Sequence, residues 1–236
     1  MLDSKSVAVI LPAAGSGRRF GASENKLFCH LAGRPLWVHS VETLCQHEAV
    51  GRLVLAVSPS DLDTFQAQLE GVHADKPIEL VSGGKERIDS VLAGVQRVGD
   101  DESITWIAVH DAARPLLTCQ DLDRVFASVG SSGAAILAEP VTSTVKRTRD
   151  EGVSCETLDR SELWLAQTPQ VFRKDLLAMA YRYHRGRHAT DDAELVSRLG
   201  VKVAIAPGSS DNLKITFPQD LFVAEAILKG RQASTR

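Results

Sequence analysis

The sequence is poor in aromatic residues and carries only a small net charge. Aromatic residues make up 5% of the 236 residues, so stacking platforms for single-stranded nucleic acid are not expected. The formal net charge is −3, without the basic excess that is typical of nucleic-acid-binding proteins. We therefore expect no nucleic-acid partner and look for a smaller anionic ligand.

Paired cysteines and long apolar runs are also missing. None of the four cysteines forms a Cys-x-x-Cys pair, which argues against a zinc site or a redox motif and favours mostly buried thiols in a reducing compartment. The first six residues lead directly into an apolar strand, so no signal peptide is expected. The apolar runs are too short to span a membrane. These features predict a cytoplasmic protein with no membrane partner.

Several common catalytic patterns are absent. The chain has no Gly-x-Ser-x-Gly elbow, no His-Glu-x-x-His motif and no evident pair of catalytic carboxylates. Seven histidines are scattered along the chain, and His110 alone follows a predicted strand. We interpret His110 as a structural hydrogen-bonding residue rather than a general base.

A glycine-rich loop that follows an apolar run is the most informative stretch. The run Val7–Pro12 has no polar alternation, which predicts a strand buried on both faces. Gly15 and Gly17 then allow backbone N–H groups to approach a ligand closely. Three cations follow: Arg18, Arg19 and Lys26. This combination predicts a polyphosphate site, and the alternative is an ordinary turn whose arginines are solvated.

Strand and helix patterns alternate along most of the chain. Strands are expected at 7–11, 53–57, 78–81, 104–109, 134–138 and 201–206, the last of them buried; helices are expected at 35–45, 60–69, 88–98, 118–128, 174–184, 191–199 and 218–228. Capping boxes are expected at 60–63 and 118–121. Strict alternation predicts an α/β protein with a mostly parallel sheet and helices on both faces. We expect residues 1–236 to form a single domain.

Three polar loops should meet at one edge of this sheet. They are 13–26, 83–90 and 110–114, and each directly follows a predicted strand. Right-handed crossovers place such loops at the same edge, where open α/β sheets bind their ligands. The sequence therefore predicts one site built from three distant segments.

The pattern breaks at residues 141–163, which are polar, β-branched and alternating. Asp150-Glu-Gly152 predicts a turn between two ribbon-like strands. A two-stranded ribbon is only marginally stable alone, so this arm could lean on a second copy of the chain. The alternative, a flexible surface hairpin, is equally compatible with the pattern.

The side chains that could take part in binding or catalysis are mainly cations on predicted loops: Arg18, Arg19, Lys26, Lys85, Arg114, Arg160 and Lys214. Such residues suit phosphoryl or nucleotidyl transfer, in which positioning and charge neutralisation carry catalysis. A phosphate monoester with a second pKa near ~6 would attack without a general base. Mg²⁺ would bridge triphosphate oxygens. Asp111, at a strand end, could contact the metal or a substrate hydroxyl, or could simply form a turn.

Six motifs occur in a characteristic order: Pro12-Ala-Ala-Gly-Ser-Gly-Arg-Arg-Phe20, Gly83-Gly-Lys-Glu-Arg-Ile-Asp-Ser-Val91, Val109-His-Asp-Ala-Ala-Arg-Pro115, Gln167-Thr-Pro-Gln170, Thr190-Asp-Asp192 and Asp211-Asn-Leu-Lys214. Together they closely resemble the 2-C-methyl-D-erythritol 4-phosphate cytidylyltransferases of the non-mevalonate isoprenoid pathway. The resemblance runs from about residue 6 to 230. It implies a Rossmann-like three-layer nucleotidyltransferase fold with a protruding β-arm that forms a homodimer.

The resemblance also implies roles for individual residues. CTP would bind at Ala13, Ala14, Gly15, Gly17, Gly84, Lys85, Ser90, Asp111 and Ala112. The acceptor, 2-C-methyl-D-erythritol 4-phosphate, would bind at Asp111, Arg114, Thr144, Arg160, Thr168, Thr190 and Lys214. Arg19 and Lys26 would stabilise the transition state, and Arg160 and Lys214 would place the attacking phosphate. Thr144 and Arg160 would reach the partner subunit's site. Mg²⁺ would be held mainly by the CTP phosphates, without a dedicated protein ligand.

One position departs from the family pattern, and three alternative functions remain. Members often have Pro-Lys-Gln where this chain has Asn25-Lys-Leu27, although Lys26 keeps its spacing from Arg19. The alternatives are a cytidylyltransferase for another polyol phosphate such as ribitol 5-phosphate, a non-catalytic nucleotide-binding module, and an NAD-dependent dehydrogenase. Phe20 at the third glycine position speaks against the dehydrogenase.

Overall fold

The computed structural model of the chain describes residues 2–15, 20, 25–148, 155–184, 186 and 188–234. The residues expected to bind phosphate at 17–19 and the turn expected at 150–152 lie outside the described residues. Among the described helices, none is both long and apolar enough to cross a membrane.

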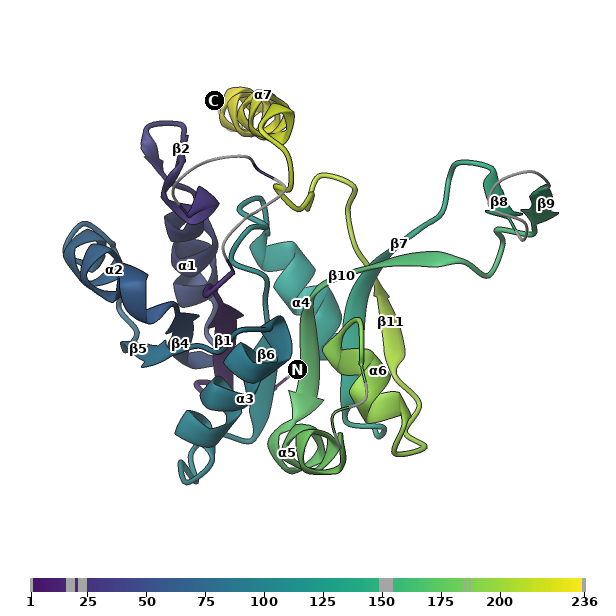
Figure 1. Cartoon of the computed structure of the whole chain (residues 1–236), viewed down its shortest axis with the longest axis horizontal. Coiled ribbons are helices and arrows are strands. Elements are labelled where there is room, and N and C mark those ends of the chain that lie inside the picture. Colours follow the sequence, from purple (N-terminus) through teal and green to yellow (C-terminus); the bar gives the residue numbers. More distant parts are fainter. Residues whose placement is uncertain are drawn as a thin grey trace.

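A seven-stranded sheet forms the centre of the molecule (Figure 1). Its strands lie in the order β11 (Ala204–Pro207), β7 (Ala134–Pro140), β10 (Trp164–Arg173), β6 (Trp106–Val109), β1 (Val7–Pro12), β4 (Val50–Val57) and β5 (Ile78–Ser82). Of these strands, β10 alone runs antiparallel to its neighbours. The predicted α/β fold with a mostly parallel sheet is confirmed.

Apolar side chains of β1 enter both layers of the core, as its unbroken apolar run predicts. Val7, Val9 and Leu11 pack on one side of the sheet, and Ala8 and Ile10 pack on the other. All five are fully buried. Because both faces of this strand need apolar cover, helices are required on both sides of the sheet.

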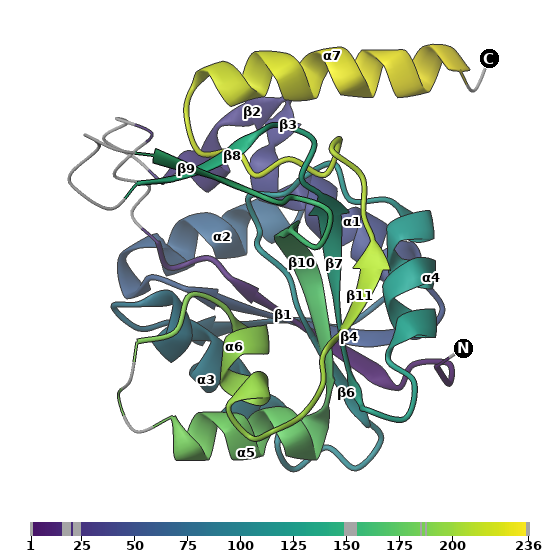
Figure 2. The same cartoon turned by 90° about the vertical axis from the view of Figure 1, so that its right-hand side faces the viewer.

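Helices supply that cover on each face (Figure 2). One layer contains α1 (Leu36–Gln46), α2 (Leu62–Leu69) and α4 (Cys119–Ser128), and the other contains α3 (Arg87–Val98), α5 (Lys174–Tyr183) and α6 (Asp192–Ser197). The last helix, α7 (Gln219–Ser234), buries Ala224 against the first layer. The predicted capping box of α4 is confirmed, since Thr118 Oγ1 accepts a hydrogen bond from the Asp121 N–H at 3.1 Å.

Two local predictions are wrong. The capping box expected at Ser60 does not form, because a 3₁₀ turn, Pro59–Asp61, precedes α2 and leaves the helix without a side-chain cap. Ser60 Oγ instead donates to its neighbour Asp61 at 3.2 Å. The last strand is not buried: β11 lies at the edge of the sheet, where Ile205 is 44% exposed. An apolar run alone does not distinguish an edge strand from a central one.

The order of the strands reverses at β1. The chain passes from β1 to β4 and β5 on one side and then returns to β6 on the other side of β1. Adjacent loops separate at such a reversal and leave a crevice at the carboxyl ends of the strands. The segments that follow β1, β5 and β6 therefore lie around one crevice.

The predicted arm is present as a separate two-stranded ribbon. β8 (Val145–Thr148) pairs antiparallel with β9 (Cys155–Leu158). Figure 1 shows this ribbon at the end of an extension of β7 and β10, well away from the sheet. A short hairpin of β2 (His30–Leu31) and β3 (Arg34–Pro35), which the sequence did not predict, precedes α1.

Candidate functional site

A cavity of about 360 Å³ opens where the predicted loops meet. Its described lining comes from five segments: Pro12 to Gly15, Lys26 and Leu27, Gly84 to Arg87 with Ser90, Asp111 to Ala113, and Lys214 with Thr216. The predicted convergence of the loops after β1, β5 and β6 is thus confirmed. Among the residues expected to bind CTP, this wall brings together Ala13, Ala14, Gly15, Gly84, Lys85, Ser90, Asp111 and Ala112.

Two adjacent glycines allow the second loop to approach the first. A Cβ atom on Gly83 would lie 2.7 Å from the Ala14 Cβ and 2.9 Å from the Ser90 Oγ. The next residue, Gly84, donates its backbone N–H to Ser90 Oγ at 3.2 Å. These contacts leave no space for a side chain at position 83, and they set the width of the cavity between the two loops.

Lys26 enters the cavity from a 3₁₀ turn that Asn25 caps. Asn25 Oδ1 accepts a hydrogen bond from the Leu27 N–H at 3.1 Å, while its amide nitrogen donates to the carbonyl of Ala13 at 3.3 Å. Asn25 therefore ties this turn to the end of β1. The Lys26 ammonium donates to the carbonyl of Ile215 at 2.6 Å. The departure from the family's proline at position 25 thus leaves the lysine turn capped.

Asp111 is the central carboxylate of the cavity wall. Its Oδ1 accepts from Arg87 Nε at 3.1 Å, and its Oδ2 accepts from Lys214 Nζ at 2.7 Å. Burial alone would raise the pKa of Asp111, but the positive charges of Arg87 and Lys214 outweigh burial and hold the pKa well below its usual range. Asp111 is therefore ionised and can accept hydrogen bonds from hydroxyl groups.

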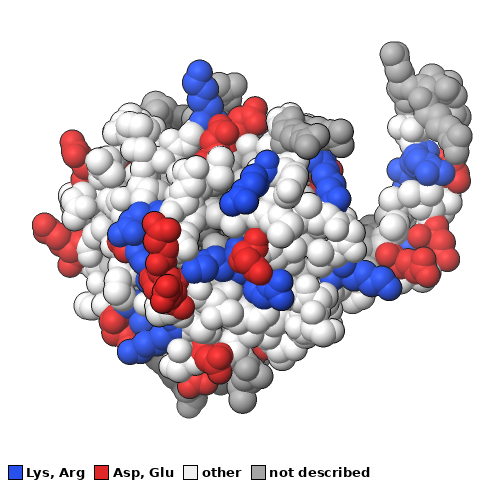
Figure 3. Space-filling view, turned by 90° about the horizontal axis from the view of Figure 1, so that it is seen from below, with Lys and Arg blue, Asp and Glu red and all other residues white. Residues whose placement is uncertain are grey.

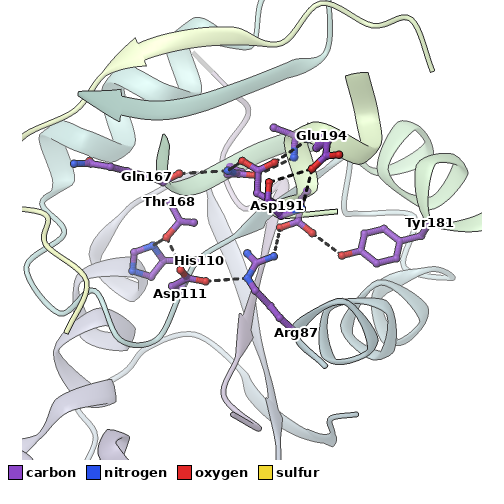
Figure 4. A network of polar contacts seen from close by, with 12 residues as sticks. Arg87, His110, Asp111, Gln167, Thr168, Tyr181, Asp191 and Glu194 are labelled. Carbon is purple, nitrogen blue, oxygen red and sulfur yellow. Dashed lines mark hydrogen bonds and ion pairs between the residues drawn. The ribbon is translucent and has the colours of Figure 1, made fainter. Parts of the chain in front are cut away.

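Arg87 joins Asp111 to a second buried carboxylate. Its Nη1 donates to Asp192 Oδ2 at 2.8 Å, and Asp192 Oδ1 accepts from the Tyr181 hydroxyl at 2.5 Å. Figure 4 shows Arg87 reaching from α3 toward Asp111, with Tyr181 approaching from α5. Burial opposes the charge of Arg87, but Asp192 and Asp111 raise its pKa above the ordinary value. Arg87 therefore remains charged between the two carboxylates.

His110 forms part of a buried chain of hydrogen bonds behind Asp111. Its Nε2 lies 3.2 Å from the carbonyl of Arg114, and its Nδ1 lies 3.2 Å from Thr168 Oγ1. Thr168 Oγ1 in turn accepts from the Asp111 backbone N–H at 3.0 Å. Because a carbonyl can only accept, the proton is assigned to Nε2, and Nδ1 accepts from Thr168. Burial lowers the pKa of His110 to about 4, so the ring is neutral near pH 7.

Arg114 supports the segment that carries Lys214. Its Nη1 donates to the carbonyl of Asn212 at 2.6 Å, and the Ile215 N–H donates to the carbonyl of Ala113 at 2.8 Å. Neither Arg114 nor Thr168 is among the described residues that line the cavity. In this structure both hold the cavity wall in place from behind.

The other predicted site residues are more widely spread. Thr190 lies two residues before α6, and its hydroxyl donates to Glu194 Oε2 at 3.0 Å. Thr144 and Arg160 are exposed beside the ribbon of β8 and β9, and neither is among the described residues that line the cavity. Gly17 and Arg19 lie outside the described residues. The structure thus brings the CTP and Lys214 positions together but does not bring the arm residues to them.

Sequence reasoning missed Arg87, which contacts two carboxylates and lines the cavity. Arg87 is the first residue of α3 and directly follows the loop after β5. This position was a usable signal, because the first turn of a helix after a parallel strand faces the ligand edge. Thr216, which also lines the cavity, carried no such signal in the sequence.

The described residues of the cavity offer few donors for a metal ion. Across the described part of the chain, no three His, Cys, Asp or Glu side chains gather as a metal site would require. Its described carboxylates are Glu86 and Asp111, and the second is already paired with two cations. This donor set fits a hard cation that arrives with a polyphosphate better than one held by protein ligands alone.

The face seen in Figure 3 carries charges of both signs. Lys and Arg side chains alternate with Asp and Glu side chains over this face and along the protruding arm. On the arm, Arg147 Nη2 lies 2.8 Å from Glu156 Oε2. This view shows no broad basic face of the kind that binds a nucleic-acid backbone.

Comparison with known proteins gives one consistent result. The sequence profile of the 2-C-methyl-D-erythritol 4-phosphate cytidylyltransferase family matches residues 7–230. The enzyme of that name from Rhodopirellula baltica is 49% identical over 232 residues, which cover 94% of this chain and 95% of the relative. The one from Bacillus licheniformis is 41% identical over 226 residues, which cover 95% of this chain and 96% of the relative.

A solved structure agrees with these sequence matches. The structure of 4-diphosphocytidyl-2C-methyl-D-erythritol synthase from Anaerococcus prevotii matches with a TM-score of 0.82 and 26% identity. The match covers 95% of this chain and 96% of that chain. The likeness therefore extends over nearly the whole length of both proteins.

Proposed function

Because the chain belongs to the 2-C-methyl-D-erythritol 4-phosphate cytidylyltransferase family, we infer that it is a nucleotidyltransferase of isoprenoid precursor biosynthesis. It transfers the cytidylyl group of CTP to 2-C-methyl-D-erythritol 4-phosphate and releases pyrophosphate. One observation assigns this reaction to the cavity: Lys26, Arg87, Asp111 and Lys214 all line it at the carboxyl edge of the sheet.

The reaction needs an oriented phosphate more than it needs a base. An oxygen of the acceptor phosphate forms a bond to the α-phosphorus of CTP. The bond between this phosphorus and the oxygen that bridges it to the β-phosphate breaks, and pyrophosphate leaves with the electron pair. The acceptor phosphate, with a second pKa near ~6, is largely a dianion at neutral pH. His110 is buried and hydrogen-bonded at both ring nitrogens, which supports a mechanism without a histidine base.

We propose that the two cavity lysines act on opposite partners of the reaction. Lys26, together with Arg19, would bind the triphosphate and stabilise the charge that builds up on the α-phosphate. Lys214 would bind the acceptor phosphate. Two features support this division: Lys26 belongs to the turn tied to β1, and Lys214 contacts Asp111 at 2.7 Å. Asp111 would then accept hydrogen bonds from acceptor hydroxyls.

Mg²⁺ is the proposed cofactor, held mainly by oxygen atoms of the CTP triphosphate. The scarcity of free carboxylates among the described cavity residues supports this arrangement. When bound, Mg²⁺ supplies charge neutralisation on the phosphates and polarises the α-phosphate. The chain's own contribution would be cationic side chains and backbone N–H groups around the same oxygens.

A homodimer in which each arm completes the partner's site is also proposed. Thr144 and Arg160 would contribute to the acceptor pocket of the other subunit. Supporting this, both residues are exposed and the ribbon of β8 and β9 extends away from its own sheet (Figure 1). An isolated ribbon of this kind gains stability only against another surface.

The reaction is proposed to take place in the cytoplasm. Burial raises the pKa of the Cys45 thiol to about 11, and burial likewise raises the pKa of Cys119. All four cysteines lie in the described part of the chain and none forms a disulfide, although only Cys45 is buried and Cys155 is exposed. Cysteines without disulfides suit a reducing compartment.

Product analysis tests the proposed reaction directly. The protein is incubated with CTP, Mg²⁺ and 2-C-methyl-D-erythritol 4-phosphate, and the mixture is followed by phosphorus NMR and mass spectrometry. We expect one pyrophosphate for each CTP consumed and the mass of 4-diphosphocytidyl-2-C-methyl-D-erythritol. Release of inorganic phosphate, or an unchanged mixture with a folded protein, would contradict the assignment.

A further inference from the structure

We propose that Asp192 and Tyr181 are positioning residues for the acceptor. They hold Arg87 against Asp111 and so fix the orientation of the Asp111 carboxylate in the cavity wall. This inference rests on the proposed function, because it takes Asp111 as the group that receives the acceptor hydroxyls. Neither Asp192 nor Tyr181 is among the described residues that line the cavity. Both would act on the reaction only through Arg87.

The contacts form one continuous line across three helices. Tyr181 on α5 donates its hydroxyl to Asp192 Oδ1 at 2.5 Å, and Arg87 Nη1 donates to Asp192 Oδ2 at 2.8 Å. Arg87 Nε then donates to Asp111 Oδ1 at 3.1 Å. Each end of the guanidinium is therefore bound, and the plane of Arg87 is fixed by two carboxylates.

The charges of the four residues in this network hold Arg87 in one orientation. Asp111, Asp192, Arg87 and Lys214 carry two negative and two positive charges, and the side chain of Asp192 is 1% exposed. A carboxylate buried to this degree must be matched by a partner, so Arg87 cannot turn away from Asp192 without a large penalty. The orientation of Arg87, and through it that of Asp111, is thereby set from outside the cavity.

Asp192 is the first residue of α6, and the residue before it, Asp191, caps this helix by accepting from the Glu194 N–H at 2.9 Å. Gln170 of β10 pins this turn from a second side, since its Nε2 donates to Asp191 Oδ2 at 2.8 Å and its Oε1 accepts from the Ala193 N–H at 2.9 Å. Figure 4 shows Asp191 and Glu194 of this turn near Arg87. Two residues assigned to the acceptor, Asp111 and Thr190, are thus held relative to each other by one network.

A specific kinetic signature follows from this placement. The network contacts the acceptor wall, whereas the Gly83–Ser90 and Ala14 contacts that set the nucleotide side do not involve Asp192. Asp111 is expected to contact both substrates, but the other CTP positions do not depend on Asp192, so loosening Asp192 should impair use of the acceptor more than the binding of CTP. A residue that only stabilised the fold would change both substrates together or neither.

The test compares the Asp192→Asn and Tyr181→Phe variants with the unchanged chain. Asp192→Asn should lower kcat/KM for 2-C-methyl-D-erythritol 4-phosphate by about tenfold or more, because a misplaced group costs rate steeply. The KM for CTP should stay within about twofold. Tyr181→Phe keeps the ion pair and should give a smaller loss, about threefold, in the same direction.

Asp121→Asn is the matched control. Asp121 is also 1% exposed and paired with an arginine, Arg124, but lies in α4 outside the described cavity lining. It should lower thermal stability while leaving both KM values unchanged. If Asp192→Asn does not fold, the folded Tyr181→Phe variant decides the question alone.

The positioning role would be overturned if Asp192→Asn impaired the kinetics for CTP and for the acceptor equally. It would also be overturned if folded Tyr181→Phe kept unchanged kinetics for the acceptor. Absence of turnover in the unchanged chain would instead refute the proposed function.

Discussion

At the scale of single residues, one short segment places both cavity lysines. Lys214 belongs to this segment, and the carbonyl of its neighbour Ile215 accepts from the Lys26 ammonium at 2.6 Å. The segment itself is held by Arg114 and by the carbonyl of Ala113. The proposed triphosphate cation and the proposed acceptor cation therefore depend on the same backbone.

Replacement of Lys26 tests the transition-state role. Lys26→Ala should leave the fold intact and lower kcat by on the order of 10², the effect expected when a charge contact to the transition state is lost. Steady-state kinetics and thermal unfolding measure both effects. Lys229→Ala, at an exposed position of α7, serves as the control and should keep full turnover. Near-normal kcat in Lys26→Ala would refute the assigned role.

The buried histidine predicts a pH dependence of stability. The pKa of His110 falls from 6.5 to about 4 in the folded chain, so between these values the unfolded chain binds the proton and the folded chain does not. Stability should be fully present above about pH 6.5 and decline by about 3 kcal/mol as the pH falls toward 4.

Denaturant unfolding at several pH values measures this decline. His110→Asn should flatten the curve in that window by removing the group, whereas His39, whose pKa is also lowered by burial, remains in both proteins. Parallel curves for the two proteins would contradict the prediction.

At the scale of elements, the sequence was sufficient for strands and helices with a strong apolar pattern. β1, α1, α3 and α4 lie where their periodicity predicts, because each must bury a well-defined apolar face. The antiparallel insertion of β10 between β6 and β7 could not be predicted, since pairing partners are set by tertiary packing rather than by local pattern.

The candidate site shows the same division. Gly84 and Ala13 could be predicted as site residues because they lie in loops that directly follow strands. The topology of the sheet brings these loops together. The ion pairs of Arg87 with Asp111 and Asp192 join residues distant in sequence, and no local pattern encodes them. Arg114 and Thr168, which the family resemblance assigns to the acceptor, also support the wall through hydrogen bonds to Asn212 and Asp111.

Close packing of two loops predicts the effect of a single methyl group. Gly83→Ala should raise the KM for CTP by about tenfold, because the new Cβ would lie 2.7 Å from Ala14 Cβ and push the nucleotide loops apart. Gly71→Ala is the matched control, since its Cβ would make only an ordinary contact of 3.7 Å. CTP titration of both folded variants is the measurement, and equal affinities would show that the loop spacing is unimportant.

At the scale of the whole molecule, the proposed arm exchange predicts complementation between two impaired variants. Arg160→Ala retains a complete core, and Lys26→Ala retains a complete arm. In a mixed dimer, the Arg160→Ala core would receive the intact arm of its partner. Random mixing gives about half mixed dimers with one restored site each, so activity should recover to about a quarter of that of the unchanged chain.

The mixture is made by refolding or co-expression, and activity is measured with the acceptor below its KM. Each variant alone provides the control. No recovery in verified mixed dimers would place Arg160 in the site of its own chain and contradict the proposed exchange.

The most direct test of the central claim is pyrophosphate release across a panel of substrates. The protein with Mg²⁺ is given CTP, ATP, GTP or UTP, each with 2-C-methyl-D-erythritol 4-phosphate or ribitol 5-phosphate. We predict release only with CTP and 2-C-methyl-D-erythritol 4-phosphate. Release with ribitol 5-phosphate instead would contradict the acceptor assignment, and no release with any pair from folded protein would contradict catalysis itself.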